Sequence, residues 1–116
     1  MSESYITVNI EEGMPLKDQA IKRLTFYVNS KKNAGYAALK VIHGFGSSGS
    51  GGVIRVAARD YLASLQRRGV IKSFIRGEDF SIFDAQTRGA FDLCPELRQD
   101  RDLERHNNGV TIVLLR

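Results

Sequence analysis

The sequence has almost no cysteine and no long apolar stretch. Cys94 is the single cysteine among 116 residues, so it has no partner for an internal disulfide, and a reducing compartment suits the chain. No run approaches the roughly 18 apolar residues of a membrane-spanning helix, and the opening Met-Ser-Glu-Ser is unlike a signal peptide. Cys94 also lacks neighbouring cysteines or histidines at ligand spacing, which argues against a metal site or a thiol nucleophile. We therefore expect a cytoplasmic protein with no membrane partner.

The sequence also lacks internal repeats and any stretch that marks a second domain. Its 42% hydrophobic and 26% charged residues are typical of a globular domain, and 116 residues suffice to bury a core without disulfides or metals. We therefore expect a single domain over residues 1–116.

Positive charge is modest overall but unevenly placed. The formal net charge is +4, yet residues 53–76 alone contain six basic side chains and one acidic side chain. Residues 77–105 show the opposite balance, with eight acidic side chains and four arginines. A basic block attracts phosphate-rich partners such as nucleic acid. On charge alone, a solvent-exposed helix face is an equal alternative.

The periodicity of apolar residues predicts an alternation of strands and helices. Short β-branched or apolar runs alternate with stretches of helical spacing, the second of which ends at Gly69 in the manner of a helix C-cap. A segment of weak periodicity, residues 77–108, then separates the last two strands and is expected to be a long insertion, with room for one helical turn at 100–106. The expected strands are 5–10, 37–42, 70–75 and 110–115, and the expected helices are 15–30 and 53–68.

The order of these elements, βαβαββ, predicts an α/β fold. Helices that connect consecutive strands favour parallel pairing with right-handed crossovers, and the last strand is expected to return antiparallel beside the third. We therefore expect a two-layer sandwich in which two helices cover a mostly parallel four-stranded sheet.

A glycine-rich stretch joins the second strand to the second helix. Five glycines and three serines lie between His43 and Val53, a composition that also suits a flexible linker. Cutting there would leave two pieces too short for cores of their own, and apolar runs adjoin the loop on both sides, so it is interpreted as a βα loop. Such loops present backbone N–H groups at the positive end of a helix, where anions bind.

Two nucleotide-binding motifs bear on this loop. Residues 44–49 match the dinucleotide pattern Gly-x-Gly-x-x-Gly, but no acidic residue ends the following strand at the required spacing, because Glu78 comes too late. The phosphate-binding loop of nucleoside triphosphatases requires a lysine after the glycines, and none follows. A small-molecule nucleotide-binding protein is therefore the least favoured alternative, and no organic cofactor is expected.

Three segments at and after this loop carry a resemblance to a known family. They read Val-Ile-His-Gly-Phe-Gly (41–46), Gly-Gly-Val-Ile-Arg (51–55) and Ala-Arg-Asp-Tyr-Leu (58–62), and they resemble the core of the Smr (small MutS-related) domain family. The resemblance implies a sandwich similar to the C-terminal domain of a bacterial translation initiation factor. It also implies recognition of nucleic-acid backbone and structure, with DNA nicking or RNA cleavage linked to DNA repair, recombination or RNA processing.

The resemblance and the expected topology nominate catalytic residues. In an open α/β sheet, ligands bind at the carboxyl ends of the strands, where His43, Glu11 and Glu12 are expected. His43 suits a general base or acid, with a structural, hydrogen-bonded histidine as the alternative. Glu11 and Glu12 stand where family members have a Leu-Asp-x-His-Gly-like motif, and they could orient His43 or bind Mg²⁺ or Mn²⁺; a solvated turn is their alternative. No dedicated set of metal ligands is expected.

Glycines, one aromatic residue and basic side chains are expected to contact nucleic acid. Arg55 and Arg59 lie one helical turn apart near the start of the second helix and suit bidentate contacts with phosphates. Phe45 is expected either to stack on an unpaired base or to pack against the insertion. The expected contacts are Gly44, Phe45, Gly46, Gly51, Gly52, Arg55, Arg59, Lys72 and Arg76. The alternative to a nucleic-acid enzyme is a non-catalytic module that binds nucleic acid, or that binds a protein through the insertion.

Overall fold

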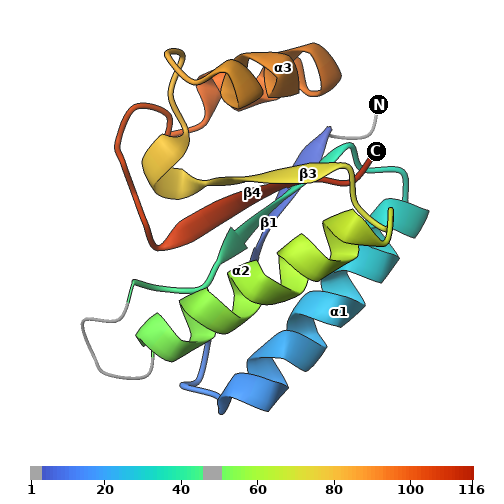
Figure 1. Cartoon of the computed structure of the whole chain (residues 1–116), viewed down its shortest axis with the longest axis vertical. Helices are drawn as coiled ribbons and strands as arrows, with labels where there is room; N and C mark the ends of the chain where they lie inside the picture. The colour runs from blue at the N-terminus through green and yellow to red at the C-terminus, as the bar shows by residue number, and fades with distance from the viewer. Residues whose placement is uncertain (1–3, 46–50) are drawn as a thin grey trace.

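The computed structural model describes residues 4–45 and 51–116, which form one four-stranded sheet with helices on both faces (Figure 1). The strands are β1 (Tyr5–Asn9), β2 (Ala38–Ile42), β3 (Ser73–Arg76) and β4 (Val110–Leu114), and the helices are α1 (Lys17–Asn33), α2 (Gly51–Arg67) and α3 (Ala85–Leu93). Two short 3₁₀ turns, η1 (Gly77–Asp79) and η2 (Pro95–Gln99), precede and follow α3. No helix in these described ranges is long and apolar enough to cross a membrane.

β4 lies inside the sheet and runs against both of its neighbours. The strand order is β1-β2-β4-β3; β1 pairs parallel with β2, whereas β4 pairs antiparallel with β2 and with β3. The expected antiparallel pairing of the last two strands is confirmed. The expectation of a mostly parallel sheet is wrong, because the crossover through α2 leaves a gap beside β2 that β4 fills. β1, β2 and β3 still point the same way, so their carboxyl ends meet at one edge of the sheet.

α1 and α2 lie side by side on one face of the sheet (Figure 1). The apolar face expected on α2 is confirmed in part: Ile54, Ala58, Leu62 and Leu65 are buried, whereas Val53, at the start of the expected stripe, is 53% exposed. α2 ends in a Schellman motif: Gly69 has φ +76°, and the N–H of Val70 donates to Leu65 O over 2.9 Å. Because this cap uses Val70, β3 begins only at Ser73, later than expected.

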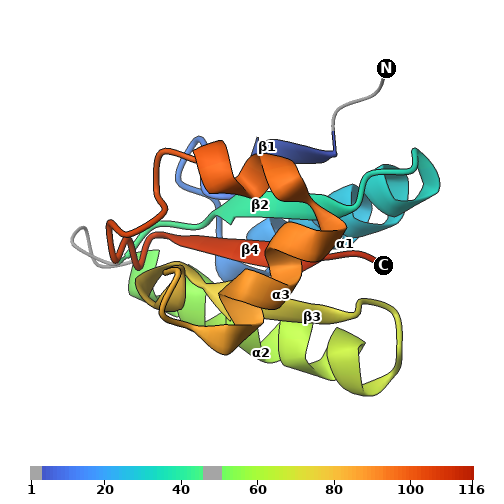
Figure 2. The same ribbon diagram turned by 90° about the horizontal axis from the view of Figure 1, so that it is seen from above.

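The 77–108 segment forms a third layer on the opposite face of the sheet (Figure 2). The insertion contains α3 and two 3₁₀ turns, so the expectations of only two helices and of a two-layer sandwich are wrong. α3 begins with an N-cap, since the Asp84 carboxylate accepts the N–H of Thr87 over 2.9 Å. Phe91 of α3 and Ile112 of β4 belong to a second core cluster, on this face. At nine residues, α3 is too short for its periodicity to stand out in the sequence.

Buried charges join this third layer to the sheet. Lys40 of β2 is 4% exposed and forms ion pairs with Asp100, at 2.8 Å, and with Asp102. Burial opposes ionisation of Asp102, but hydrogen bonds from Lys40 and Asn107 outweigh it and lower the pKa of that carboxyl. Residues 101–106 form turns, so the helical turn expected there is wrong.

Candidate nucleic-acid interface

One edge of the sheet collects most of the candidate residues. It consists of the segments that follow β1, β2 and β3 and the segment that precedes β4, and we call it the carboxyl edge (residues 10–12, 43–45, 77–79 and 107–109). Glu11, His43 and Glu78 stand there on separate segments. Lys72 does not, because it precedes β3 and its N–H donates to Leu114 O at the opposite edge of the sheet, over 2.9 Å.

The His43 ring is completely buried, and both of its nitrogens are hydrogen-bonded. Since a carbonyl only accepts, Nδ1 carries the proton and donates to Gly44 O over 2.8 Å. Nε2 then accepts from the Thr111 hydroxyl, also at 2.8 Å. Burial lowers the pKa of His43 to about 4, and the charges of Arg59 and Arg55 act in the same direction, while the hydrogen bond to Gly44 opposes them. The ring is therefore neutral and has no contact with solvent. Its hydrogen bonds position the backbone of Gly44 and the side chain of Thr111.

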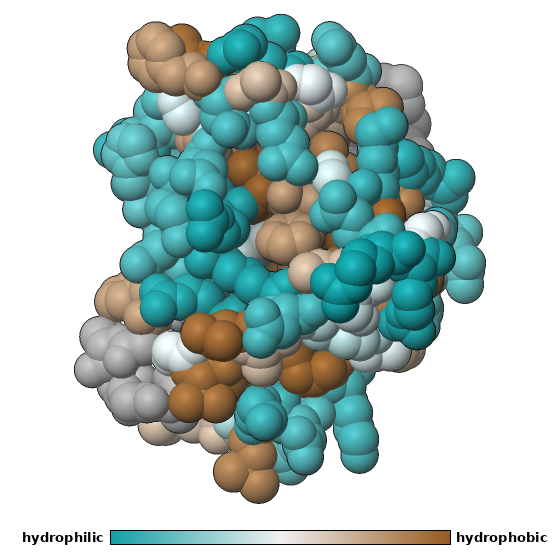
Figure 3. Space-filling model, in the orientation of Figure 1, coloured by the Kyte–Doolittle hydropathy of each residue, from teal (hydrophilic) through white to brown (hydrophobic). Residues whose placement is uncertain are grey.

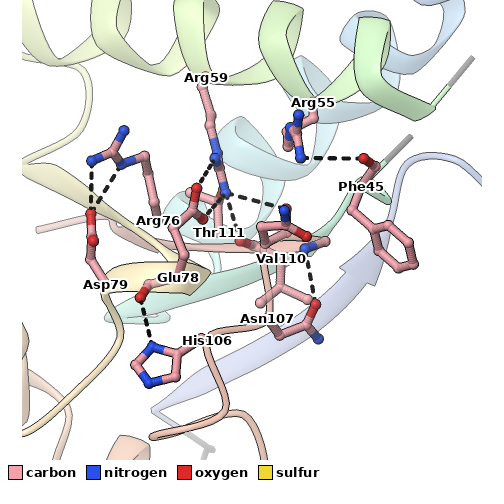
Figure 4. Close-up of polar contacts among 12 residues, drawn as sticks. Phe45, Arg55, Arg59, Arg76, Glu78, Asp79, His106, Asn107, Val110 and Thr111 are labelled. Carbon is pink, nitrogen blue, oxygen red and sulfur yellow. Dashed lines mark hydrogen bonds and ion pairs between the residues drawn. The ribbon is translucent and has the colours of Figure 1, made fainter. Parts of the chain in front are cut away.

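Arg59 links α2 to β4 and η1 (Figure 4). Its Nη1 and Nη2 donate to the two carboxylate oxygens of Glu78 at 2.9 and 2.8 Å. Its Nε donates to the Thr111 hydroxyl over 3.1 Å, and Nη2 also donates to Val110 O over 3.2 Å. The side chain is only 14% exposed, and its N–H donors are already hydrogen-bonded to other groups of the protein. Arg59 therefore stabilises the carboxyl edge by joining its segments. Its expected contact with phosphate stays a prediction.

Glu11 lies against the backbone of Gly44. Gly44 has φ +77°, and a Cβ at that position would lie 2.1 Å from Glu11 Oε2, so only glycine accommodates both the backbone conformation and the carboxylate. Gly44 is thus contacted by the Glu11 carboxylate and by the His43 ring. The side chain of Glu12 is exposed, while its carbonyl accepts from Arg23 Nη1 over 2.6 Å.

The described residues do not provide a ready metal site. Within residues 4–45 and 51–116, no three His, Cys, Asp or Glu side chains converge to hold an ion. Both nitrogens of His43 already have partners. Among the described residues, the protein alone therefore offers no complete ligand set for Mg²⁺ or Mn²⁺, and dependence on these ions stays a prediction.

Basic side chains flank the carboxyl edge beside α2 and β3. Arg55 donates from Nη1 to Phe45 O over 3.3 Å (Figure 4). Arg76 is exposed and pairs with Asp79 at 2.9 Å. Arg55 and Arg76 both line a hollow of about 670 Å³. Figure 3 shows this face of the molecule hollowed near its centre, with hydrophilic side chains around much of the rim.

The start of α2 also lies at this edge. Gly51 and Gly52 are its first two residues, and the first N–H groups of a helix have no partner within the helix. Glycine has no side chain to keep an anion away from such N–H groups, and this is why the sequence nominated Gly51 and Gly52 as phosphate contacts. Gly46, the remaining expected glycine, lies outside the described residues.

The third layer adds two arginines that the sequence did not nominate. Arg101 and Arg105 line a second hollow, of about 590 Å³, together with Phe45, which is 55% exposed. Both belong to a segment that is acidic on balance, and only the folded chain brings them beside Phe45, so no local signal could have found them. Thr111 was missed for a different reason, because a threonine in a strand is unremarkable in a sequence.

Comparison with solved structures shows which known fold the chain resembles. The chain is similar to the crystal structure of the Smr domain of Thermus thermophilus MutS2, with a TM-score of 0.54 over 97% of this chain and 98% of that chain. The two sequences are 19% identical over this alignment. No family model matches the sequence, and no curated protein does. The likeness confirms that the chain has an Smr-like fold.

Proposed function

We propose that this chain, which has the fold of an Smr domain, binds nucleic acid through phosphate contacts at the carboxyl edge. One observation carries the proposal: positive groups from three separate segments converge on that edge. Arg55 and the N-terminus of α2 come from one segment, Arg76 from the end of β3, and Arg101 and Arg105 from the third layer.

The chemistry of these groups suits a polyphosphate backbone. Arginine presents a planar fork of donors that matches a phosphate group, and the start of a helix adds backbone N–H groups and a partial positive charge. Contacts with phosphates fix the position of a protein on nucleic acid but carry no sequence information. We therefore expect recognition of backbone and structure rather than of sequence, with a net charge of +4 favouring the encounter.

Removing charge from the carboxyl edge tests this proposal. Arg55→Ala/Arg76→Ala removes two positive charges there, and Arg67→Ala/Arg68→Ala removes two exposed arginines from the opposite end of α2. Fluorescence anisotropy with labelled single-stranded, duplex and branched DNA and RNA measures the affinity of each variant. We expect the first variant to bind at least about tenfold more weakly than the second. Equal affinities, or no binding by the wild type at low salt, contradict the proposal.

Cleavage of the phosphodiester is the further activity that the resemblance implies. The buried ring of His43 has no free nitrogen, so among the expected catalytic residues the carboxylate of Glu11 is the better candidate for a general base toward water or a ribose hydroxyl. Supercoiled plasmid and structured RNA, incubated with Mg²⁺, Mn²⁺ or EDTA, test this assignment. Glu11→Gln is expected to abolish cleavage and Glu12→Gln, at an exposed turn, to preserve it. Equal cleavage by both variants rules out Glu11.

A protein-binding adaptor is the second candidate, and exposed apolar side chains favour it. Ile82 and Phe83, in the third layer, are 47% and 84% exposed. Their burial in a complex would be favourable. Sedimentation equilibrium over a range of concentrations measures self-association of the wild type and of Phe83→Ser. Association that the substitution weakens supports this candidate, whereas a monomer at every concentration counts against a self-interface.

A further inference from the structure

Phe45 presents an aromatic ring to solvent. The ring is 55% exposed, although apolar side chains of this size are usually buried. Its backbone carbonyl accepts from Arg55, and one ring edge packs close to Gly109, where a Cβ would lie 3.1 Å from Phe45 Cδ1. The residue is therefore supported on one side and open on the other.

The open side of Phe45 borders the hollow of about 590 Å³ described above. This volume falls within the roughly 300–1,000 Å³ of typical small-ligand sites. Arg101 and Arg105 line it and are exposed, and neither forms an ion pair within the described parts of the chain. Asn107, which also lines the hollow, donates to Asp102 and accepts from the N–H of Gly109. These hydrogen bonds within the protein position this part of the lining.

Asn108 also lines the hollow, together with Asp102 and His106. Asn108 is exposed and lines both hollows. Its carbonyl accepts from Arg59, which fixes the backbone at this position. A side-chain amide has both donors and an acceptor, which is what the edge of a nucleobase requires.

We infer that this hollow binds one unpaired nucleotide of a single strand. The base stacks on Phe45, Asn108 contacts the base edge, and Arg101 and Arg105 hold the adjoining phosphates. The inference rests on the proposed nucleic-acid binding and deepens it, because it names the substrate class. In a duplex both faces of every internal base are already stacked, so a free aromatic ring favours unpaired nucleotides.

The test compares substitutions at two exposed phenylalanines. Phe45→Leu keeps an apolar side chain against Gly109 but removes the π face, Phe45→Trp keeps a π face, and Phe26→Leu changes a control residue on α1 that is 65% exposed. The probes are oligo(U) and oligo(dT), each with one 2-aminopurine, and a blunt duplex of the same length. Anisotropy gives affinity, and 2-aminopurine fluorescence reports stacking. The two single strands separate RNA from DNA.

The expected result is specific to Phe45 and to single strands. Phe45→Leu should weaken single-strand binding by about 5- to 100-fold, with little effect on the duplex, while Phe45→Trp and Phe26→Leu bind as the wild type does. Arg101→Ala/Arg105→Ala should weaken single-strand binding and flatten its dependence on salt. Stacking should quench 2-aminopurine in the wild-type complex and not in the Phe45→Leu complex.

Three results overturn the inference while leaving the proposed function intact. These are equal losses for single strand and duplex in Phe45→Leu, equal effects of Phe45→Leu and Phe26→Leu, or unchanged 2-aminopurine fluorescence when the wild type is saturated with single strand. The absence of any nucleic-acid binding by the wild type at low salt overturns both. Thermal unfolding followed by circular dichroism verifies that each variant is folded.

Discussion

Arg59 and Glu78 are joined by two parallel hydrogen bonds, of 2.9 and 2.8 Å, across 19 positions of the chain. The same guanidinium donates to Thr111, and Thr111 donates to the buried ring of His43. α2, η1, β4 and the end of β2 therefore meet at one side chain. This network gives the carboxyl edge a fixed shape in the absence of any ligand.

The first prediction concerns the guanidinium of Arg59. Lysine has a single ammonium group and cannot reproduce the fork toward Glu78 together with the bond to Thr111. Arg59→Lys should therefore lower the free energy of unfolding by about 1–3 kcal/mol, as measured by urea denaturation. Arg67→Lys, at an exposed position near the end of α2, is the matched control and should change little. Equal stability of the two variants would show that the network adds nothing.

The second prediction concerns pH. The unfolded chain protonates His43 near pH 6.5, whereas burial lowers its pKa to about 4 in the folded protein. Between these values the unfolded state binds more protons, so stability falls as the pH decreases below 6.5, by up to about 1.4 kcal/mol per pH unit. The loss levels off below about pH 4, once both states are protonated.

Urea unfolding at several pH values measures how much the protonation of His43 contributes to this loss of stability. His43→Gln retains a polar side chain but cannot titrate, so the difference in stability between wild type and variant should shrink steadily from pH 7 toward pH 4. A difference that stays constant over this range would contradict a buried, neutral imidazole.

The third prediction uses two glycines with nearly identical φ angles. Gly44 has φ +77° and Gly69 has φ +76°, but a Cβ meets the Glu11 carboxylate at the first position and nothing within 4 Å at the second. Gly69→Ala should cost about 1–2 kcal/mol for the left-handed conformation alone. Gly44→Ala should cost more, because Glu11 must also move.

A rescue experiment isolates the steric part of that cost. In the Gly44→Ala background, Glu11→Ala should recover the excess over Gly69→Ala, as measured by urea denaturation of the single and double variants. Equal costs for the two glycine substitutions would mean that Glu11 does not rest on Gly44.

The fourth prediction concerns the buried lysine. Lys40→Met removes the partner of two carboxylates, Asp100 and Asp102, and should destabilise the protein by about 3–5 kcal/mol. Amide hydrogen exchange should show the largest loss of protection in α3 and η2, because the ion pairs join that layer to the sheet. Lys72→Met, at an exposed position, is the control. Similar stabilities of the two variants would contradict this role of Lys40.

The sequence predicts those features that depend on neighbouring residues. The stripe of α2 and the cap at Gly69 follow from local spacing. The crossovers through α1 and α2 orient β1, β2 and β3 alike, and this is why Glu11 and His43 were correctly expected at the same edge of the sheet.

The features that could not be predicted from the sequence depend on contacts between residues that are far apart in the chain. The insertion of β4 between β2 and β3 joins strands that are far apart in the sequence, and the buried face of the third layer belongs to a short helix and two 3₁₀ turns. Lys40 interrupts an apolar strand, and its partner Asp100 is 60 positions away. Arg101 and Arg105 reach Phe45 only through the same folded layer.

The central claim is that phosphate contacts at the carboxyl edge drive binding, and the salt dependence of nucleic-acid affinity tests it most directly. The logarithm of the binding constant should fall linearly with the logarithm of the salt concentration, by about 0.7 to 0.9 per phosphate contacted. Arg55→Ala/Arg76→Ala should reduce that slope by up to about two contacts, whereas Arg67→Ala/Arg68→Ala should leave it unchanged. A flat slope for the wild type, or the same reduction in both variants, would contradict the account.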